Sequence, residues 1–266
     1  MDKVYKFYPP NFNVKQHWED RYAQEHIAGR DAADFRNQGF WPLLQQQLTK
    51  EGTYLDAGCG VGGWVAFLHE EGYTVAGIDT AARTVRALTE YNADLDVKIA
   101  PVTRIPYPNQ SFDGVLAIGT LEYLEEELPS ALQEVHRVLK PNGLLFLEVP
   151  YANVLRRLLY LPLKRVQYHL FKQLGYHPTF AHYFMDRATV AQLLQQTGFT
   201  VEQVAPHDLP NADGHYGLYV DWRIFRGGSP YHLNFLGKIV KVITNAISPW
   251  VASTGMVVVA RKTNHS

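Results

Sequence analysis

A glycine-rich turn follows the apolar run Thr53–Ala57 and limits the folds open to this chain. Residues 58–63 read Gly-Cys-Gly-Val-Gly-Gly, and apolar residues at helical spacing begin at Trp64. Glycine permits positive φ and a close approach of ligand to backbone, and a helix start offers unpaired N–H groups. Asp79 ends the next apolar run, where an acid can accept both hydroxyls of a ribose. The pattern predicts an adenosine-containing cofactor at the C-terminal edge of a sheet.

Strands and helices alternate along the chain. Apolar runs predict strands, and helical spacing predicts helices. Because the strands are apolar almost throughout, we expect an α/β fold with a parallel sheet covered on both faces. We expect one domain over residues 1–266, with insertions at about 151–186 and 206–254, of which 206–230 is loop. The expected strands are 53–57, 74–78, 97–100, 112–118, 144–149, 199–204 and 256–260, and the expected helices are 64–71, 81–92, 126–139, 153–174 (broken at Pro162), 187–197 and 235–246.

Composition excludes several classes of protein. The 266 residues are 46% hydrophobic and 19% charged, which is typical of a globular chain and not of a disordered one. The single cysteine rules out an internal disulfide scaffold and is typical of a reducing compartment. A net charge of -1 argues against a nucleic-acid partner. No apolar signal segment opens the chain and no run is long enough to span a membrane, so we expect a cytoplasmic protein.

The glycine turn fits two kinds of cofactor. Gly58, Gly60 and Gly63 match the dinucleotide pattern G-x-G-x-x-G, a weak signal by itself that leaves an NAD-dependent oxidoreductase as an alternative. The same segment also reads Asp56-x-Gly58-x-Gly60-x-Gly62. An acid at position 56 would be poorly placed beside a pyrophosphate, whereas it suits a ligand that carries an ammonium group.

The second reading resembles class I S-adenosylmethionine-dependent methyltransferases, especially the small-molecule group called type 11. Five further segments carry the resemblance in the expected order. They are 17–22 (a W-x-x-x-Y helix), 111–115 (SFD-x-V), 121–124 (LEYL for LEHL), 131–143 (ALQEVHRVLKPNG) and 193–201 (LLQQTGFTV). The resemblance implies a Rossmann-like, doubly wound, seven-stranded sheet of order 3-2-1-4-5-7-6, with the last strand antiparallel.

The resemblance also implies the cofactor, S-adenosyl-L-methionine, with S-adenosyl-L-homocysteine as product. In this sequence, the positions that match the family's cofactor site are Tyr22, Asp56, Gly58, Cys59, Gly60, Asp79, Thr80, Val102, Thr103, Ile118 and Gly119. One position departs from the family, which often has an Asp where Pro101 stands. Backbone groups would then have to contact the adenine amine.

The acceptor is less constrained. Gly119-Thr120-Leu121-Glu122 stands where some nitrogen methyltransferases have [DNS]-P-P-[FYW], and Cys59 lies in the glycine turn, which excludes a cysteine-dependent cytosine enzyme. No cluster has metal-ligand spacing. We expect methyl transfer to oxygen, nitrogen or carbon of a small molecule, with a non-catalytic S-adenosylmethionine-binding protein as an alternative. Candidate catalytic residues are Glu122, Tyr123, Tyr151, His177, His182 and Tyr183.

Two basic, apolar segments carry a further signal. The first half of the chain is acidic and the second half basic, and residues 152–176 hold five cations and no acid. Residues 235–246 repeat the pattern with Lys238 and Lys241. We expect the first to form a helical lid over an apolar or anionic acceptor. Packing against a second subunit and contact with a membrane surface are the alternatives.

Overall fold

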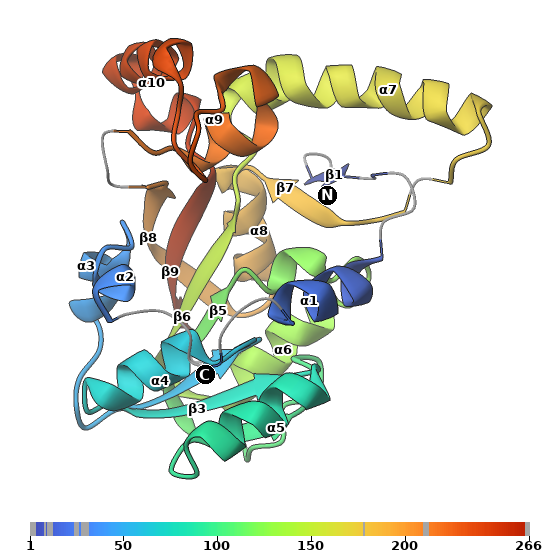
Figure 1. Ribbon diagram of the computed structural model, residues 1–266. Coiled ribbons are helices and arrows are strands. Elements are labelled where there is room, and N and C mark those ends of the chain that lie inside the picture. Colours follow the sequence, from blue (N-terminus) through green and yellow to red (C-terminus); the bar gives the residue numbers. More distant parts are fainter. Residues whose placement is uncertain are drawn as a thin grey trace.

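The computed structural model describes residues 4–7, 9, 13–23, 27, 32–177, 179–209 and 213–263 (Figure 1). Its centre is a seven-stranded sheet in the order β4-β3-β2-β5-β6-β9-β8. The strands are β2 (Thr53–Ala57), β3 (Thr74–Asp79), β4 (Asp96–Ile99), β5 (Phe112–Ile118), β6 (Leu139–Pro150), β8 (Phe199–His207) and β9 (Gly255–Lys262). Only β9 runs antiparallel to its neighbours among these strands. The expected order and the antiparallel last strand are confirmed.

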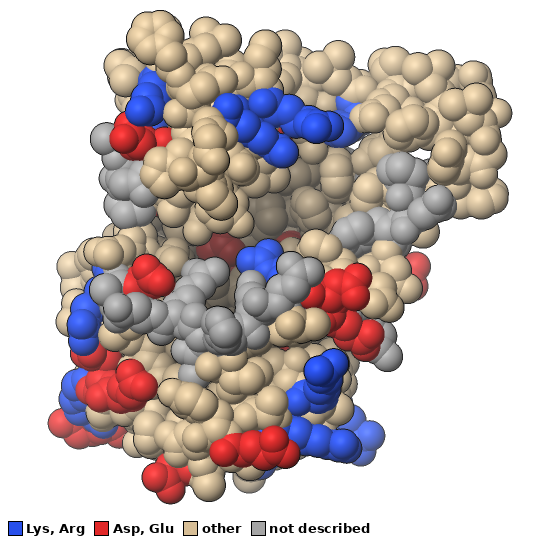
Figure 2. All heavy atoms as spheres, in the orientation of Figure 1, with Lys and Arg blue, Asp and Glu red and all other residues tan. Residues whose placement is uncertain are grey.

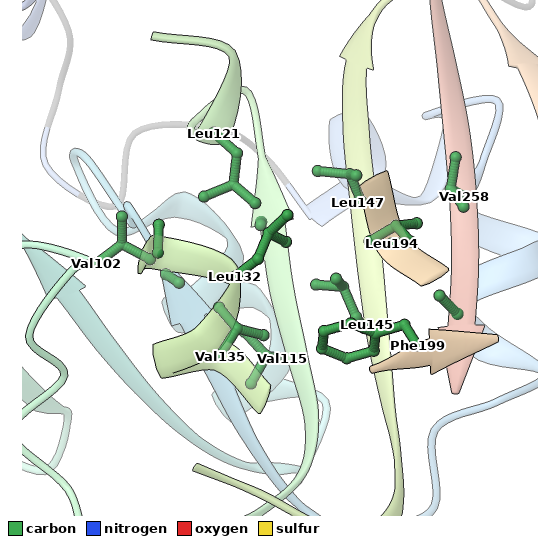
Figure 3. Close-up of a cluster of buried hydrophobic side chains, with 14 of the residues drawn as sticks. Val102, Val115, Leu121, Leu132, Val135, Leu145, Leu147, Leu194, Phe199 and Val258 are labelled. Atoms are coloured by element: carbon green, nitrogen blue, oxygen red, sulfur yellow. The ribbon is translucent and has the colours of Figure 1, made fainter. Parts of the chain in front are cut away.

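Helices cover both faces of the sheet because successive strand residues point to opposite sides. On β5, Val115 and Ala117 pack in the cluster that α6 (Leu128–Val138) and α8 (Arg187–Gln196) complete, whereas Leu116 packs on the other side. Figure 3 shows the first cluster, with α6 side chains against β5 and Leu194 of α8 beside β6. The second is completed by α2 (Ala32–Arg36), α3 (Trp41–Gln45), α4 (Gly63–Glu70) and α5 (Ala82–Tyr91).

A small second sheet was not predicted. β1 (Val4–Phe7) pairs antiparallel with β7 (His182–Met185), so that residues from opposite ends of the chain lie side by side. Ring contacts support the pairing, since Phe7 lies 5.1 Å from His182 and 5.8 Å from Phe184, centroid to centroid. The short strand thereby joins the segment before α1 (Val14–Tyr22) to the insertion that follows β6.

Two expectations about the insertions are corrected. The segment 206–230 is not all loop, since it contains α9 (Tyr216–Asp221) and the 3₁₀ turn η3 (Arg223–Phe225). His215 caps α9 by accepting the Leu218 N–H at 3.1 Å, a histidine cap that composition does not reveal. Pro162 does not break the helix before it, because it lies in the first turn of α7 (Leu161–Gln173), where its missing N–H has no helical partner to lose. A π-helical turn, η2 (Arg156–Tyr160), leads into α7.

The helices α7, α9 and α10 (Phe235–Ile247) lie together at the end of the molecule opposite α4 and α5 (Figure 1). Within the described ranges, no helix is long and apolar enough to cross a membrane.

Candidate cofactor and acceptor site

A cavity of about 1140 Å³ lies at the carboxyl ends of β2, β3 and β5. In an open parallel sheet this edge is where ligands bind. Its walls come from α1, from the turn after β3 with α5, from the segment after β4, and from the residues after β5. The lining residues include Trp18, Glu19, Tyr22, Gly58, Asp79, Thr80, Ala100, Pro101, Val102, Thr103, Gly119, Thr120, Tyr123 and Glu127. Figure 2 shows a hollow across the middle of one face, with acidic and basic side chains at its floor.

The glycine turn is held by two close approaches. Gly58 has a φ of 96°, and a Cβ there would lie 2.2 Å from the Thr120 hydroxyl oxygen. Gly60 has a φ of 52°, and a Cβ there would lie 2.9 Å from the Tyr22 hydroxyl oxygen. Any side chain at either position would collide with a wall of the cavity. Glycine therefore lets Thr120 and Tyr22 approach the turn closely, and of the two glycines only Gly58 lines the described cavity walls.

Asp79 ties the turn to the end of β3. Its Oδ2 accepts the Gly60 N–H at 2.9 Å, and its Oδ1 accepts the Ala81 N–H at 2.8 Å. An ionised carboxylate has about four lone-pair positions, so two remain for other donors. Asp79 is 8% exposed and lines the cavity. The geometry fits a residue that orders the loop and can also accept two ribose hydroxyls.

Asp56 lies beneath the turn and does not line the cavity. It is 3% exposed, and burial, with a smaller contribution from the charge of Asp79, raises the pKa of its carboxyl to about 7. A buried carboxyl of this kind is stabilised in its ionised form by a nearby cation. Cys59 also lies outside the cavity walls. Burial raises the pKa of the Cys59 thiol well above its ordinary value, so it packs as a neutral side chain.

The expected adenine wall lies opposite the glycine turn. Thr80, Val102 and Thr103 all line the cavity, as do Ala100 and Pro101. Val102 is buried and packs into the core beneath the wall. Because Pro101 has neither a polar side chain nor an N–H, the polar contacts available here come from its neighbours. The residues present fit an adenosine with an apolar base wall and an acidic ribose site.

The roof of the cavity is α1. Trp18 lies 5.4 Å from Tyr22 and 5.3 Å from Tyr123, centroid to centroid, so that one face of α1 closes over the turn after β5. The Arg21 guanidinium lies 5.3 Å from the Trp18 ring. Sequence reasoning named Tyr22 but missed Trp18, Glu19 and Thr120. The four-residue spacing of Trp18 and Tyr22 was the available signal, since such residues share one face of a helix.

The expectation that the basic segment 153–174 forms the roof is wrong. The described cavity walls include no residue of that segment. Arg156 is 3% exposed instead, and its Nε donates to Asp221 Oδ2 at 2.7 Å. A further guanidinium nitrogen donates to the Tyr151 carbonyl oxygen at 2.9 Å. Arg156 therefore joins η2 to α9 inside the protein, and α7 packs through Tyr168 on Phe7 of β1, away from the cavity.

Two carboxyl groups flank the cavity residue Gly119, one buried (Glu122) and one partly exposed (Glu148). Glu122 belongs to the 3₁₀ turn η1 (Leu121–Tyr123), and Glu148 lies beside Ile118 in the register of β5 and β6. Burial raises the Glu122 pKa well above its ordinary value, and the charge of Glu148 raises it further. Burial also raises the Glu148 pKa, to about 7, although Arg156 and the Gly119 N–H oppose the rise. Glu122 Oε2 has no hydrogen-bond partner among the described atoms.

The other predicted acceptor residues do not all lie at one place. Tyr123 lines the cavity, and its ring is 6.1 Å from His182. Burial, with the charges of Arg156 and His17, lowers the His182 pKa to about 3, so this imidazole is neutral and weakly basic. The Tyr183 hydroxyl donates to the Glu125 carbonyl, and Tyr151 packs on Trp250. His177 is exposed. None of the last four residues lines the cavity walls that the structure describes.

No group of three or more His, Cys, Asp or Glu side chains in the described residues could hold a metal ion. The arrangement instead brings a glycine cradle, a ribose acceptor and an apolar base wall to one end of a cavity. Tyr123 stands at the other end, and the carboxyl groups of Glu122 and Glu148 lie beside Gly119 without lining the described cavity walls.

Comparisons with known proteins agree with this geometry. A family described as a methyltransferase domain matches residues 23–204. The uncharacterized methyltransferase YodH of Bacillus subtilis is 35% identical over 95 residues, which is 34% of this chain and 40% of that protein. The chain spans no more than 40% of the length of the first curated relatives it matches.

Solved structures show the same fold at low identity. One is a complex of the Haloferax volcanii Trm112 methyltransferase activator with a putative methyltransferase, with a TM-score of 0.63, 15% identity, and coverage of 96% of this chain and 99% of that one. Another is the Burkholderia thailandensis 1,6-didemethyltoxoflavin-N1-methyltransferase, with 1,6-didemethyltoxoflavin and S-adenosylhomocysteine bound. It has a TM-score of 0.55 and 16% identity over 98% of this chain and 95% of that one.

Proposed function

Because the chain belongs to the methyltransferase-domain family and is an S-adenosylmethionine-dependent methyltransferase, we propose that its acceptor is a small molecule with an ionisable N–H or O–H group. One observation carries the proposal. A single cavity joins the glycine turn and Asp79 to Tyr123 and to Gly119, which the Glu122–Glu148 pair flanks. Donor and acceptor can therefore meet in one space that the lid α1 covers.

The cofactor end of the cavity has one set of tasks. S-adenosylmethionine supplies an electrophilic methyl group when bound. The backbone at Gly58 and Gly60 would face its methionine end, and Asp79 would accept the ribose hydroxyls with its two remaining lone-pair positions. Asp56 would stabilise the ammonium group through the loop, because its buried carboxyl gains from a nearby cation.

The acceptor end has to remove a proton, since an N–H or O–H group that gains a methyl group loses its hydrogen. A general base works best with a pKa near the operating pH. The Glu148 pKa of about 7 meets this condition, whereas the His182 pKa of about 3 does not. We therefore assign the base to the Glu122–Glu148 pair, with Glu148 as the group that titrates near pH 7, and assign Tyr123 to positioning of the acceptor.

The size and chemistry of the acceptor follow from the same walls. A cavity of about 1140 Å³ must hold both the cofactor and the acceptor. Trp18, Tyr22 and Tyr123 favour a flat or apolar acceptor, because aromatic faces stack on such groups. The Burkholderia neighbour, which carries a small heteroaromatic acceptor on this fold, supports an acceptor of that class.

The proposal is tested in two steps on the purified protein. Calorimetric titration should show binding of S-adenosylhomocysteine and no binding of NAD. Incubation of a fractionated small-molecule extract with isotopically labelled S-adenosylmethionine should then label a compound that contains an N–H or O–H group. Binding without any transfer would favour the non-catalytic alternative, and binding of NAD in place of S-adenosylhomocysteine would favour the oxidoreductase.

A further inference from the structure

The end of the molecule formed by α7, α9 and α10 exposes most of its large apolar side chains. Outside this end, Tyr91 and Ile99 are the large hydrophobic residues that the described structure leaves exposed. On α10, Phe235 is 81% exposed, Val242 69% and Ile247 72%, whereas the buried residues of this helix are Gly237 and Thr244. An ordinary surface helix turns its apolar stripe to the core. α10 therefore turns its large apolar side chains toward solvent and its small residues toward the protein.

α7 shows the same inversion. Leu163, Val166 and Leu170 are 61%, 62% and 54% exposed, and their spacing of three and four residues makes one stripe on the helix. The side of α7 that faces the protein carries Leu161 and Tyr168. We call the solvent-facing apolar surface of the two helices the outer face; it consists of Leu159, Leu163, Val166, Leu170, Leu174, Phe235, Leu236, Ile239, Val242, Ile243 and Ile247.

The charge around the outer face is mainly positive. Residues 151–185 contain no acid, and Asp221 is buried against Arg156. The exposed acid Asp213 pairs with Lys238 of α10 at 2.6 Å. The other exposed cations there are Arg157, Arg165, Lys172, Arg223 and Arg226. Figure 2 shows Lys and Arg gathered over α9 and the start of α7, below an outer rim without charged atoms. An apolar rim bordered by cations matches an interface of acyl chains and anionic headgroups.

We propose that the outer face is a docking surface for an anionic membrane, with α7 and α10 lying in the plane of the headgroups. A second copy of the chain is a poorer occupant. A two-fold interface pairs this surface with itself, so two mainly positive surfaces would meet in a desolvated contact. A membrane supplies both an apolar layer for the leucines and negative charge for the arginines. The inference does not depend on which acceptor is methylated.

The inference is tested by sedimentation of the full chain with lipid vesicles. The protein should bind vesicles of phosphatidylcholine mixed with phosphatidylglycerol and bind pure phosphatidylcholine weakly, and added salt should reduce binding. Arg157→Glu with Arg165→Glu should lower the partition coefficient roughly 30-fold or more. Phe235→Ser with Val242→Ser should lower it at least about tenfold. These side chains are exposed, so circular dichroism should show an unchanged fold.

Matched controls lie at the other end of the molecule. Tyr91→Ser removes an apolar side chain that is 58% exposed, and Arg86→Glu reverses an exposed cation on α5. Both variants should bind vesicles like the natural chain. A Phe235→Trp variant adds a readout of depth, because its extra fluorescence should be quenched by lipids brominated on the acyl chain. Failure to sediment with either vesicle would overturn the inference. So would light scattering that finds a dimer which Phe235→Ser with Val242→Ser dissociates.

Discussion

At the scale of single residues, the glycine turn is held between two carboxyl groups with different tasks. Asp79 accepts two backbone N–H groups and faces the cavity, whereas Asp56 is buried under the turn. The charge of Asp79 contributes to the raised Asp56 pKa. A bound cation would reduce the electrostatic repulsion between the Asp56 and Asp79 carboxylates. The glycine turn should therefore bind a positively charged ligand more tightly than a neutral one.

The Asp79→Asn variant should separate ligand binding from folding. It keeps the volume of the side chain but removes the charge and one acceptor atom. Affinity for S-adenosylhomocysteine should fall by about 1.5–3 kcal/mol, the usual contribution of hydrogen bonds to a charged group, as read by calorimetry. Asp94→Asn changes an exposed acid after α5 and should leave affinity unchanged. Equal affinities for Asp79→Asn and the natural chain would remove Asp79 from the cofactor site.

The Asp56→Asn variant should change how stability depends on pH. The folded pKa of about 7 lies above the ordinary 3.8, so the folded state holds a proton that the unfolded state releases between these values. The free energy of unfolding of the natural chain therefore falls, by up to about 4 kcal/mol, as pH rises from about 4 to 7. Asp56→Asn has no such group to titrate and should not show this fall. Thermal unfolding should show a variant advantage that is larger at pH 8 than at pH 5. The same advantage at both pH values would contradict the buried ionisation.

The carboxyl pair sets the expected pH profile of catalysis. A base acts only when it is ionised, so kcat should rise with pH through about 7, the Glu148 pKa. Glu148→Gln should lower kcat by about 10²- to 10⁴-fold and flatten the profile, with little change in cofactor affinity. Glu126→Gln, on an exposed acid of the same segment as Glu122, is the control. An unchanged profile in Glu148→Gln would place the base elsewhere.

At the scale of elements, α1 closes the cavity although none of its described residues is fully buried. Trp18 contacts Tyr123 in the turn after β5, and Tyr22 contacts Gly60 in the glycine turn. Of the described strands of the central sheet, the first after α1 is β2. A helix with few buried contacts opens locally at low free-energy cost. We infer that α1 moves when the cofactor enters and leaves.

A Trp18→Ala variant should therefore release cofactor faster. Loss of the Trp18 contact with Tyr123, worth about 0.5–1.5 kcal/mol, should raise the dissociation rate of S-adenosylhomocysteine roughly two- to tenfold. The association rate should change little. Surface plasmon resonance measures both rates, and Gln16→Ala, on an exposed position of the same helix, serves as control. A dissociation rate equal to that of the natural chain would mean that α1 is no lid.

The elements of the sheet could be predicted because their signals are local. Phe112–Ile118 and Thr53–Ala57 are mostly apolar and each is followed by a glycine, so both strands were bounded correctly. The β1–β7 pair could not be predicted, because Val4–Phe7 pairs with residues nearly two hundred positions away. The exposure of the apolar sides of α7 and α10 could not be predicted either. Periodicity shows that a helix has an apolar stripe, but not whether that stripe faces the core or solvent.

The candidate site was predicted unevenly for a related reason. Gly58 and Asp79 lie in a pattern with fixed spacing, and both line the cavity. Glu148 could have been predicted as a site residue, because it is the one acid inside the apolar run Leu144–Val149. Its partnership with Glu122 required knowing that β5 and β6 are neighbours and that Ile118 faces Glu148 across them. Arg156 was misjudged because exposure cannot be inferred from a charge alone.

At the scale of the whole molecule, one buried ion pair joins the two insertions. Arg156 and Asp221 have side chains that are each 4% exposed, and they connect η2 to the end of α9. Asp221→Asn would leave the guanidinium buried without its counter-charge and should cost about 3–5 kcal/mol in thermal or denaturant unfolding. Asp213→Asn breaks the exposed pair with Lys238 and should leave the unfolding midpoint nearly unchanged. Similar losses of stability in the two variants would mean that the buried Arg156–Asp221 pair contributes no more than an exposed pair.

The position of β9 has a consequence for how the chain is made. β9 lies between β6 and β8, yet of the described strands it is the last to be synthesised. Until it emerges from the ribosome, β6 and β8 each present an unpaired edge, and such edges recruit other chains. The nascent chain can therefore complete its central sheet only after translation has passed Lys262, and until then these strand edges stay open to pairing with other chains.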